Sequence, residues 1–279
     1  MTITSETHVE RRRSDLAPQL GETRESTLGG LTVSVIMPIL NEEAGLEATL
    51  PHLPRYITEV IVVDGGSTDR SIDVLARIRP DALLLRQDGR GKGDALKTGI
   101  RAATGDIIVT MDADGSMDPR DIDAAMERLL QGDHFVKGSR CLPGGGSDDF
   151  TPIRKAGNAF LTGVTNAAVG RKFTDITYGF NAYWRSVEDL VHDLADGFEF
   201  EIQLAVRAAQ AGLRTSEVAC HEATRVGGAS KLHAVRDGWR ILRSILSEAR
   251  SGEHHRWHLP EPQSAPGGGE FAPSALADR

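Results

Sequence analysis

The chain has 279 residues, of which 39% are hydrophobic and 26% charged, values that are ordinary for a soluble globular protein. The formal net charge of −8 argues against nucleic acid as a partner. Cys141 and Cys220 lie far apart without C-x-x-C spacing, so no disulfide framework or structural zinc site is expected, and a reducing cytosol fits. Neither a membrane-spanning run of about 18 apolar residues nor the apolar core of a signal peptide is present.

Both ends of the chain are predicted to be disordered. Residues 1–30 are polar and lack periodicity, and residues 251–279 contain Pro and Gly that would break a helix or a strand. One folded domain without internal repeats is therefore expected over residues 31–250.

Strand and helix signals alternate along the first half of this domain. β-branched and apolar runs predict strands at 32–37, 59–63, 82–85, 106–111 and 134–137. Helical spacing predicts helices at 42–53, from a cap at Ser67 or Thr68 to Ile78, at 92–103, from Asp118-Pro119 to 130, and at 198–211. This alternation predicts an α/β fold with a mostly parallel sheet covered on both faces.

Polar clusters follow three of the predicted strands, at 38–42, 64–69 and 112–114. Ligands bind outside the carboxyl ends of parallel strands, so the clusters are expected to form one site. Successive side chains on a strand point to opposite faces, so Asp112 and Asp114 can act together only where the strand ends and bends. There they can meet a divalent cation that also holds a diphosphate, as Mg²⁺ does. A solvated Asp-Gly turn is the alternative for this segment alone.

Two nucleotide-binding classes are excluded by spacing. The segment Gly89–Gly93 is followed by Asp94, so it lacks the G-x-x-x-x-G-K-[ST] pattern of a P-loop. The first predicted strand is not followed by G-x-G-x-x-G, which argues against a Rossmann dehydrogenase.

The order of the motifs resembles that of the family 2 glycosyltransferases, which are inverting enzymes of the GT-A fold with one Rossmann-like sheet. The resemblance covers residues 33–246, and the downstream half is most similar to the dolichol/polyprenyl-phosphate mannose synthases and polyprenyl-phosphate glucosyltransferases. The upstream motifs are Pro38-x-x-Asn41-Glu42, Val62–Asp69, Gly91-Lys92-Gly93, Asp112-Ala113-Asp114 and Gly138-Ser139-Arg140. The downstream motifs are Arg154-x-x-x-Asn158, Asp175-x-x-x-Gly179-Phe180, Gly197–Glu201 and Arg225-x-Gly227-x-x-Ser230-Lys231-Leu232.

The resemblance implies a nucleotide-sugar donor and a DxD pair, Asp112 and Asp114, that holds Mg²⁺ or Mn²⁺. Two positions depart from commoner family residues: Gly65 stands where many members have a second Asp, and Ser116 where a Gln often helps hold the metal. The donor-binding residues that the resemblance implies are Pro38, Asn41, Glu42, Asp64, Gly66, Ser67, Lys92, Asp112, Ala113, Arg225, Ser230 and Lys231.

The chemistry of the transfer assigns further roles. Negative charge builds on the departing diphosphate, and cations stabilise it. The second half supplies Arg140, Arg154, Arg225 and Lys231. An alcohol acceptor needs a base, for which Asp175 is favoured over Glu201, whereas a lipid phosphate is already anionic and needs none. The predicted catalytic residues are therefore Asp175, Arg140 and Glu201.

Residues 232–249 predict an amphipathic helix with one apolar stripe. Arginines lie beside the stripe, which leaves two interpretations open: the stripe packs on the sheet with the arginines in water, or the helix contacts an anionic membrane. The stripe consists of Leu232, Val235, Trp239, Leu242, Leu246 and Ala249, and the arginines are Arg236, Arg240, Arg243 and Arg250.

Together these features predict a metal-dependent inverting hexosyltransferase in the cytoplasm, or peripheral at the inner face of the membrane. Its donor would be of the GDP-mannose or UDP-glucose type, and its acceptor a polyprenyl phosphate. A soluble small-molecule or glycan acceptor is the first alternative, and a non-catalytic nucleotide-sugar-binding protein is the second. The donor sugar, the nucleobase, the preferred metal and any homo-oligomer are left open.

Overall fold

The computed structural model describes residues 28, 30–227 and 234–251. The predicted disordered ends lie almost wholly outside these residues, so their disorder stays a prediction. Ser230 and Lys231 also lie outside them, so their predicted role in donor binding stays a prediction. The strands are β1 Val33–Ile39, β2 Glu59–Asp64, β3 Leu83–Arg86, β4 Ile107–Thr110, β5 Phe135–Ser139, β6 Gly146–Ser147, β7 Asn181–Trp184, β8 Thr215–Ala219 and β9 His221–Glu222. The helices are α2 Glu43–Thr49, η1 Leu50–His52, α3 Ser71–Ile78, α4 Lys92–Ala102, α5 Asp121–Leu130, α6 Pro152–Val169, η2 Arg185–Val191, α7 Glu199–Gln210 and α8 Ala234–Ser251.

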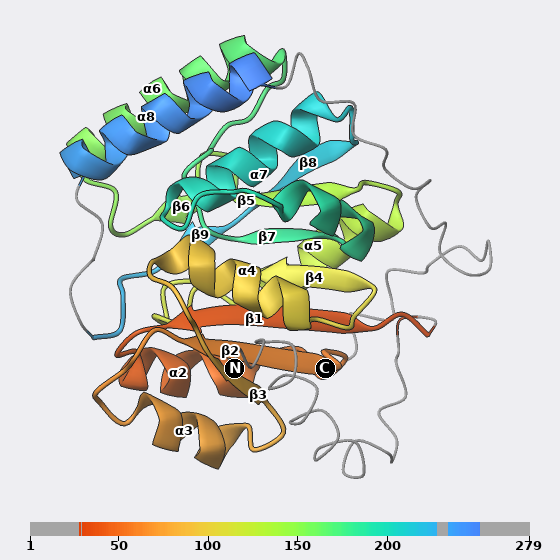
Figure 1. Cartoon of the computed structure of the whole chain (residues 1–279), viewed down its shortest axis with the longest axis vertical. Helices are drawn as coiled ribbons and strands as arrows, with labels where there is room; N and C mark the ends of the chain where they lie inside the picture. The colour runs from red at the N-terminus through yellow and green to blue at the C-terminus, as the bar shows by residue number, and fades with distance from the viewer. Residues whose placement is uncertain (1–27, 29, 228–233, 252–279) are drawn as a thin grey trace, which may run out of the picture.

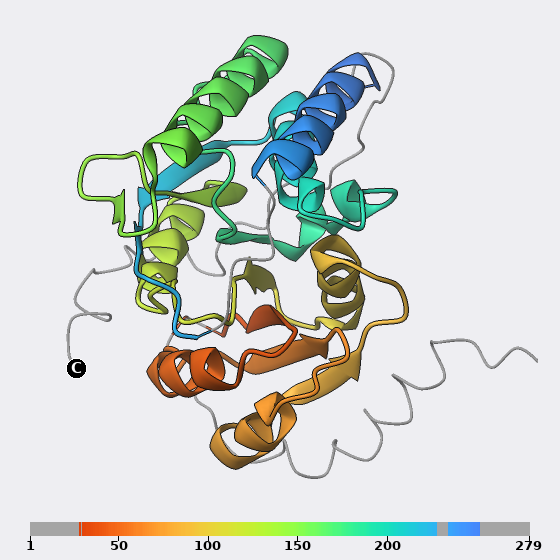
Figure 2. The ribbon, with the colours of Figure 1, turned by 90° about the vertical axis from the view of Figure 1, so that its left-hand side faces the viewer.

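A seven-stranded sheet of order β3-β2-β1-β4-β7-β5-β8 forms the centre of the molecule (Figure 1). All neighbouring strands are parallel except β7, which runs antiparallel to β4 and β5. A separate two-stranded ribbon pairs β6 with β9. The carboxyl ends of β1, β2 and β4 lie at one edge of the sheet, which faces the viewer in Figure 2. The predicted α/β fold with a mostly parallel sheet is confirmed.

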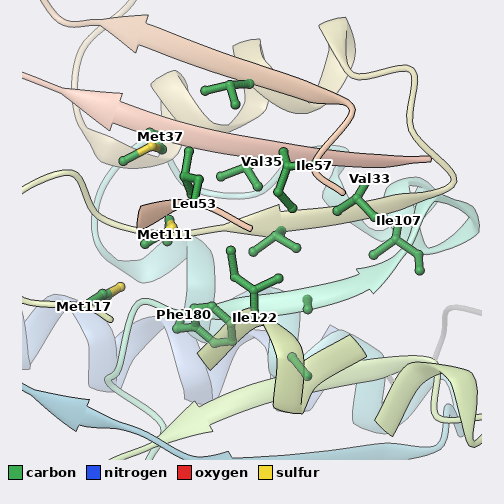
Figure 3. Close-up of a cluster of buried hydrophobic side chains, with 14 of the residues drawn as sticks. Val33, Val35, Met37, Leu53, Ile57, Ile107, Met111, Met117, Ile122 and Phe180 are labelled. Carbon is green, nitrogen blue, oxygen red and sulfur yellow. The ribbon is translucent and has the colours of Figure 1, made fainter. Parts of the chain in front are cut away.

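Two hydrophobic cores cover the two faces of the sheet, because side chains of each strand alternate between them. On β1, Val35 and Met37 join the core beneath α2, α3 and α5 (Figure 3), whereas Ile36 joins the core beneath α4 and α7. Burying each such side chain contributes about 1.5–3 kcal/mol. The two cores hold the strand ends, and hence the loops of the polar edge, in fixed register.

Two predicted helix starts are wrong. Helix α3 begins at Ser71 without a side-chain cap from Ser67 or Thr68, because both residues bond Asn41 in the neighbouring loop instead. Helix α5 begins at Asp121, and Pro119 lies in the turn before it, where its carbonyl accepts from the N–H of Ile122.

The C-terminal helix α8 packs on α6 and α7 through a face that coincides only in part with the predicted apolar stripe. The side chains that it buries are Asp237, Ile241, Ile245 and Glu248, against α6 and α7. Within the predicted apolar stripe, Trp239 is 61% exposed and Leu246 is 42% exposed. Leu242 of the same stripe is partly buried and packs against the core, so the predicted docking holds for Leu242 but not for Trp239 and Leu246. Among the described helices, none has the length and apolarity needed to cross a bilayer.

Candidate active site at the carboxyl edge of the sheet

The loops after β1 and β2 are bonded to each other. Asn41 adopts a left-handed backbone (φ 57°), which Asn tolerates better than most residues. Its N–H donates to Ser67 Oγ at 2.9 Å, and its Oδ1 accepts from the N–H of Thr68 at 2.7 Å. The Ser67 N–H in turn donates to Asp64 Oδ1 at 2.9 Å, which fixes a carboxylate that is only 6% exposed. Pro38 lies beside Val63 in the same edge of the sheet.

The DxD loop follows directly on β4, as the sequence predicts. Helix α2 lies against this loop so closely that a Cβ on Gly45 would be 2.1 Å from the carbonyl oxygen of Ala113. Both the N–H and the hydroxyl of Ser116 donate to Asp114 Oδ1, at 2.9 and 2.6 Å. Ser116 thus orients Asp114, which is buried.

Lys92, Asp112 and Glu201 form a first charge cluster, called here the Lys92 cluster. Lys92 Nζ lies 2.6 Å from Asp112 Oδ1 and 3.1 Å from Glu201 Oε2. The second oxygen of Glu201, Oε1, is buried without a hydrogen-bond partner. A Cβ on Gly179 would lie 2.7 Å from Lys92 Nζ and 3.1 Å from oxygens of both carboxylates. Three sequence-predicted residues, from α4, the loop after β4 and α7, therefore meet beneath Gly179.

Burial and charge act on this cluster in opposite directions. Burial lowers the pKa of Lys92, but the two carboxylates beside it raise that pKa above its ordinary value. Burial raises the pKa of Glu201, and the Lys92 ammonium only partly opposes this. Glu201 is therefore a buried carboxyl group that contacts one lysine, Lys92, and also feels the charge of Lys137.

The segment after β9 crosses the DxD loop and brings Arg225 to it. The N–H of Ala223 donates to the Ser116 carbonyl, and the N–H of Val226 donates to the Asp114 carbonyl, both at 2.9 Å. Arg225 Nη2 lies 2.7 Å from Asp114 Oδ2, and Nη1 lies 3.6 Å from Glu42 Oε1. The structure thus brings the predicted residues Glu42, Asp114 and Arg225 together.

Arg140, Asp175 and Glu222 form a second charge cluster, called here the Arg140 cluster. Arg140 donates to Asp175 through Nε (2.7 Å) and Nη2 (3.0 Å), and to Glu222 through Nη1 (3.0 Å). Its guanidinium lies 4.1 Å from the ring centroid of Phe150 and 5.0 Å from that of Tyr178. Burial would raise the pKa of Asp175, but Arg140 holds it below its usual range.

Asp175 has no exposed surface, and both of its oxygens accept from Arg140. A base must come within hydrogen-bond reach of the proton that it takes, and this geometry gives Asp175 no such reach. Its predicted role as a base therefore stays a prediction that the arrangement does not favour. Arg154 pairs with Asp149 at the start of α6 and does not join either cluster.

Asp112 and Asp114 suit a metal that keeps water and substrate ligands. The described residues contain no group of three or more His, Cys, Asp or Glu that could enclose a metal ion. Asp112 is 27% exposed at its side chain, and each of the two carboxylates is paired with one cation. Mg²⁺ and similar ions are commonly held by one or two carboxylates together with substrate phosphates and water. The donor set therefore fits a divalent ion that arrives with a diphosphate.

Sequence reasoning missed Lys137, Glu222 and Asn181. Lys137 and Asn181 are fully buried next to the two clusters, and Glu222 completes the Arg140 cluster. The signal for Lys137 was present, since a charged residue stands in the predicted strand 134–137. Glu222 carries no comparable signal.

The model of the family "Glycosyl transferase family 2" matches residues 34–191, more than half of the chain. The chain belongs to this family. An uncharacterized glycosyltransferase of Mycobacterium tuberculosis is 32% identical over 224 residues, which cover 77% of this chain and all of that protein. The undecaprenyl-phosphate mannosyltransferase of Micrococcus luteus is 31% identical over 240 residues, covering 81% of this chain and 96% of that protein.

Solved structures show the same fold. Glucosyl-3-phosphoglycerate synthase from Mycobacterium tuberculosis, in complex with Mn²⁺, UDP-glucose and glycerol 3-phosphate, superposes with a TM-score of 0.64 at 23% identity. The superposition covers 81% of this chain and 83% of that one. The GT-A fold and the assignment as a family 2 glycosyltransferase, both predicted from the motifs, are confirmed.

Proposed function

We propose that this family 2 enzyme is a metal-dependent inverting glycosyltransferase that moves a hexose from a nucleotide-sugar to a polyprenyl phosphate at a membrane surface. The observation that carries the acceptor assignment is the exposed apolar face of α6 and α8. The relative named as an undecaprenyl-phosphate mannosyltransferase supports the same acceptor class.

The two helices lie side by side at one end of the molecule (Figures 1 and 2). On α6, Ile153 is 77% exposed and Phe160 is 59% exposed, and no charged residue occurs from Ala156 to Val169. Burying such side chains in a bilayer interface is favourable, whereas leaving them in water is not.

Helix α8 adds cations to this apolar face. Arg243 lies over the ring of Trp239 with its guanidinium 5.9 Å from the centroid, and Arg240 and Arg250 are exposed on the same helix. An amphipathic helix with aromatic and aliphatic side chains beside arginines binds the interface of anionic membranes. Arginine side chains can extend to lipid headgroups while their stems remain in apolar surroundings.

The carboxyl edge of the sheet supplies the donor chemistry. Asp64, Pro38 and the Asn41 loop lie where the nucleoside would bind, and Lys92 and Arg225 hold the two Asp side chains in place. A divalent ion at Asp112 and Asp114 would offset the charge that builds on the departing diphosphate. A lipid phosphate is an anionic nucleophile, so the buried and fully paired Asp175 need not act as a base.

Release of nucleoside diphosphate tests the reaction. GDP-mannose, UDP-glucose, UDP-GlcNAc and dTDP-sugars would be supplied with Mg²⁺ or Mn²⁺, with and without a short-chain polyprenyl phosphate. Release that requires the lipid phosphate is expected. Turnover without lipid dependence would overturn the acceptor assignment and favour a soluble acceptor. If no donor is cleaved under any condition, the chain is not the proposed transferase.

A variant of the exposed face tests the membrane role separately. The double substitution Trp239→Ser and Leu246→Ser is expected to lower turnover of a long-chain acceptor embedded in anionic vesicles, while turnover of a short-chain acceptor in detergent is kept. Ile72→Ser, an exposed apolar residue on α3, is the matched control and should change neither rate. Equal rates of the double variant and the control on vesicles would contradict the membrane role.

A further inference from the structure

Lys137 is a fully buried lysine that none of the roles above uses. It lies on β5 directly opposite Asn181 of β7 and has no exposed surface. Its Nζ donates to the carbonyl oxygen of Tyr178 at 2.5 Å and to Asn181 Oδ1 at 3.3 Å. Burying an ammonium group costs free energy unless it is bonded and paired with charge. The hydrogen bonds of Lys137 must therefore offset the cost of burying it.

The segment Tyr178–Asn181 that Lys137 holds separates the two charge clusters. On one side, Gly179 lies against the Lys92 cluster so closely that a Cβ would be 2.7 Å from Lys92 Nζ. On the other side, the ring of Tyr178 lies under the guanidinium of Arg140. Asn181 Nδ2 also donates to Thr110 Oγ1 at 3.2 Å, which ties the segment to the end of β4 just before the DxD loop. One ammonium group thus contacts both ends of the segment between the clusters.

Resting on the proposed glycosyl transfer, we propose that Lys137 is a positioning residue that fixes the segment Tyr178–Asn181 and thereby places Gly179 over the Lys92 cluster. A flexible lysine with three donors can bond a carbonyl and an amide oxygen at once, which a planar guanidinium does less readily. Without these bonds the segment would be free to move away from Lys92, Asp112 and Glu201. A displacement of about 1 Å in a catalytic arrangement can cost about 10²-fold in rate.

Charged groups of both signs surround Lys137. Glu201 on α7, Asp175 before β7 and Glu217 on β8 are the carboxylates that act on it, and Arg140 opposes them. Burial nevertheless lowers the pKa of Lys137 below its ordinary value. The lysine thus supplies two hydrogen bonds at a position between the carboxylates of the two clusters.

A purely structural role, in which Lys137 only ties β5 to β7, predicts a different result. Such a role would lower the melting temperature of Lys137→Met and leave kcat unchanged below that temperature. The matched control is Ser34→Ala, since Ser34 is also fully buried and bonds Glu59 and the N–H of Gly105 at the opposite edge of the sheet. Its loss should lower the melting temperature and spare kcat.

The test compares kcat and donor KM of wild type, Lys137→Met, Lys137→Gln and Ser34→Ala by nucleoside diphosphate release. For Lys137→Met, kcat is expected to fall by about 10²-fold with a much smaller change in KM, and Lys137→Gln should recover part of the loss because it keeps a donor. The proposal would be overturned if kcat of Lys137→Met lay within about twofold of the wild-type value, or if Ser34→Ala lost as much kcat as Lys137→Met. An inactive wild type would instead refute the glycosyl transfer itself.

Gly179→Ala decides the question if Lys137→Met does not fold. The backbone of Gly179 is not among the left-handed ones, so alanine adds a methyl group without backbone strain. That methyl group would displace Lys92 Nζ. Lower kcat in a folded Gly179→Ala supports the close approach of Gly179 to the Lys92 cluster, on which the proposal rests, and wild-type kcat in this variant overturns the proposal.

Discussion

The Lys92 cluster and the Arg140 cluster lie on opposite sides of one short segment, and both combine a cation with two carboxylates. In the Arg140 cluster, both oxygens of Asp175 accept from the guanidinium, and Glu222 takes a third donor. In the Lys92 cluster, a single ammonium serves Asp112 and Glu201, and Glu201 Oε1 is buried with no partner. One cluster is saturated with hydrogen bonds, whereas the other is not.

The pKa values of Asp175 and Glu201 shift in opposite directions because the balance between burial and the neighbouring cation differs in the two clusters. Arg140 outweighs burial and lowers the pKa of Asp175, whereas burial outweighs Lys92 and raises the pKa of Glu201. A saturated pair contributes to structure because removing either charge leaves the other unpaired. An unsaturated cluster with a partly exposed member, Asp112, still has groups that can bind a ligand. From this comparison we propose donor chemistry for the Lys92 cluster and scaffolding for the Arg140 cluster.

The largest expected effect is on the donor side. Asp112→Asn should lower kcat/KM for nucleotide-sugar by about 10²–10³-fold, because one predicted metal ligand and the partner of Lys92 lose their charge together. Nucleoside diphosphate release measures this, and circular dichroism checks the fold. Asp118→Asn, which only breaks an exposed pair with Arg120, is the control and should keep full activity. Full activity in Asp112→Asn would remove the DxD pair from the site.

On the other side of the segment, Asp175→Asn should act first on stability. Removing one charge of a buried pair costs about 3–5 kcal/mol, and Glu222 should keep the loss near the lower end. Urea denaturation gives the free energy of unfolding. The control Asp149→Asn breaks an exposed pair with Arg154 and should cost about 1 kcal/mol or less. An Asp175→Asn variant that is stable but inactive would restore Asp175 as the base.

Glu201→Gln should show the reverse pattern and so sharpen the comparison. Burial disfavours the charged form of Glu201, so a neutral side chain of the same shape should leave the melting temperature unchanged or raise it. Activity should nevertheless fall by about 10–100-fold, because Lys92 and through it Asp112 lose a partner. Calorimetry and the release assay give the two readouts. A variant that is both less stable and fully active would place Glu201 in the scaffold.

The sequence predicts the first half of the fold well, but of the second half only the helices α7 and α8. The strands β1 to β5 and the helices between them alternate in the period of their apolar residues. That period can be recognised in the sequence because it follows the face that each element buries in the core. Strand β7 has only four residues and enters the sheet between β4 and β5, a pairing that no local signal encodes. Helix α6 contains Gly157 and Gly163, which weaken a helical signal.

The site is predictable in its membership but not in its electrostatics. Motif order brings Asp112, Lys92 and Glu201 to one edge, as the carboxyl ends of parallel strands require. Which carboxylate is saturated depends on contacts between distant segments, such as Arg140 with Asp175 and Glu222, and spacing does not reveal these. The same limit explains α8, whose apolar stripe is clear in the sequence but is only partly buried: Leu242 packs against the core, whereas Trp239 and Leu246 are exposed.

The pH dependence of stability tests the two clusters with the smallest expected effect. The pKa of Asp175 is lowered from 3.8, so its contribution to stability is present above that pH and is lost as the pH falls through the lower folded value. The pKa of Glu201 is raised from 4.5, so the native state binds its proton more tightly, and its contribution is present below pH 4.5 and lost as the pH rises through the folded value.

Urea midpoints between acidic and neutral pH, compared with wild type, separate these two signs. The deficit of Asp175→Asn should shrink as the pH falls below 3.8, because the wild-type carboxylate then loses its own advantage. The gain of Glu201→Gln should instead grow as the pH rises above 4.5, since only the wild type must then bury a charge. Parallel curves for both variants would mean that the two carboxylates feel the same environment, and the contrast between a saturated and an unsaturated cluster would be lost.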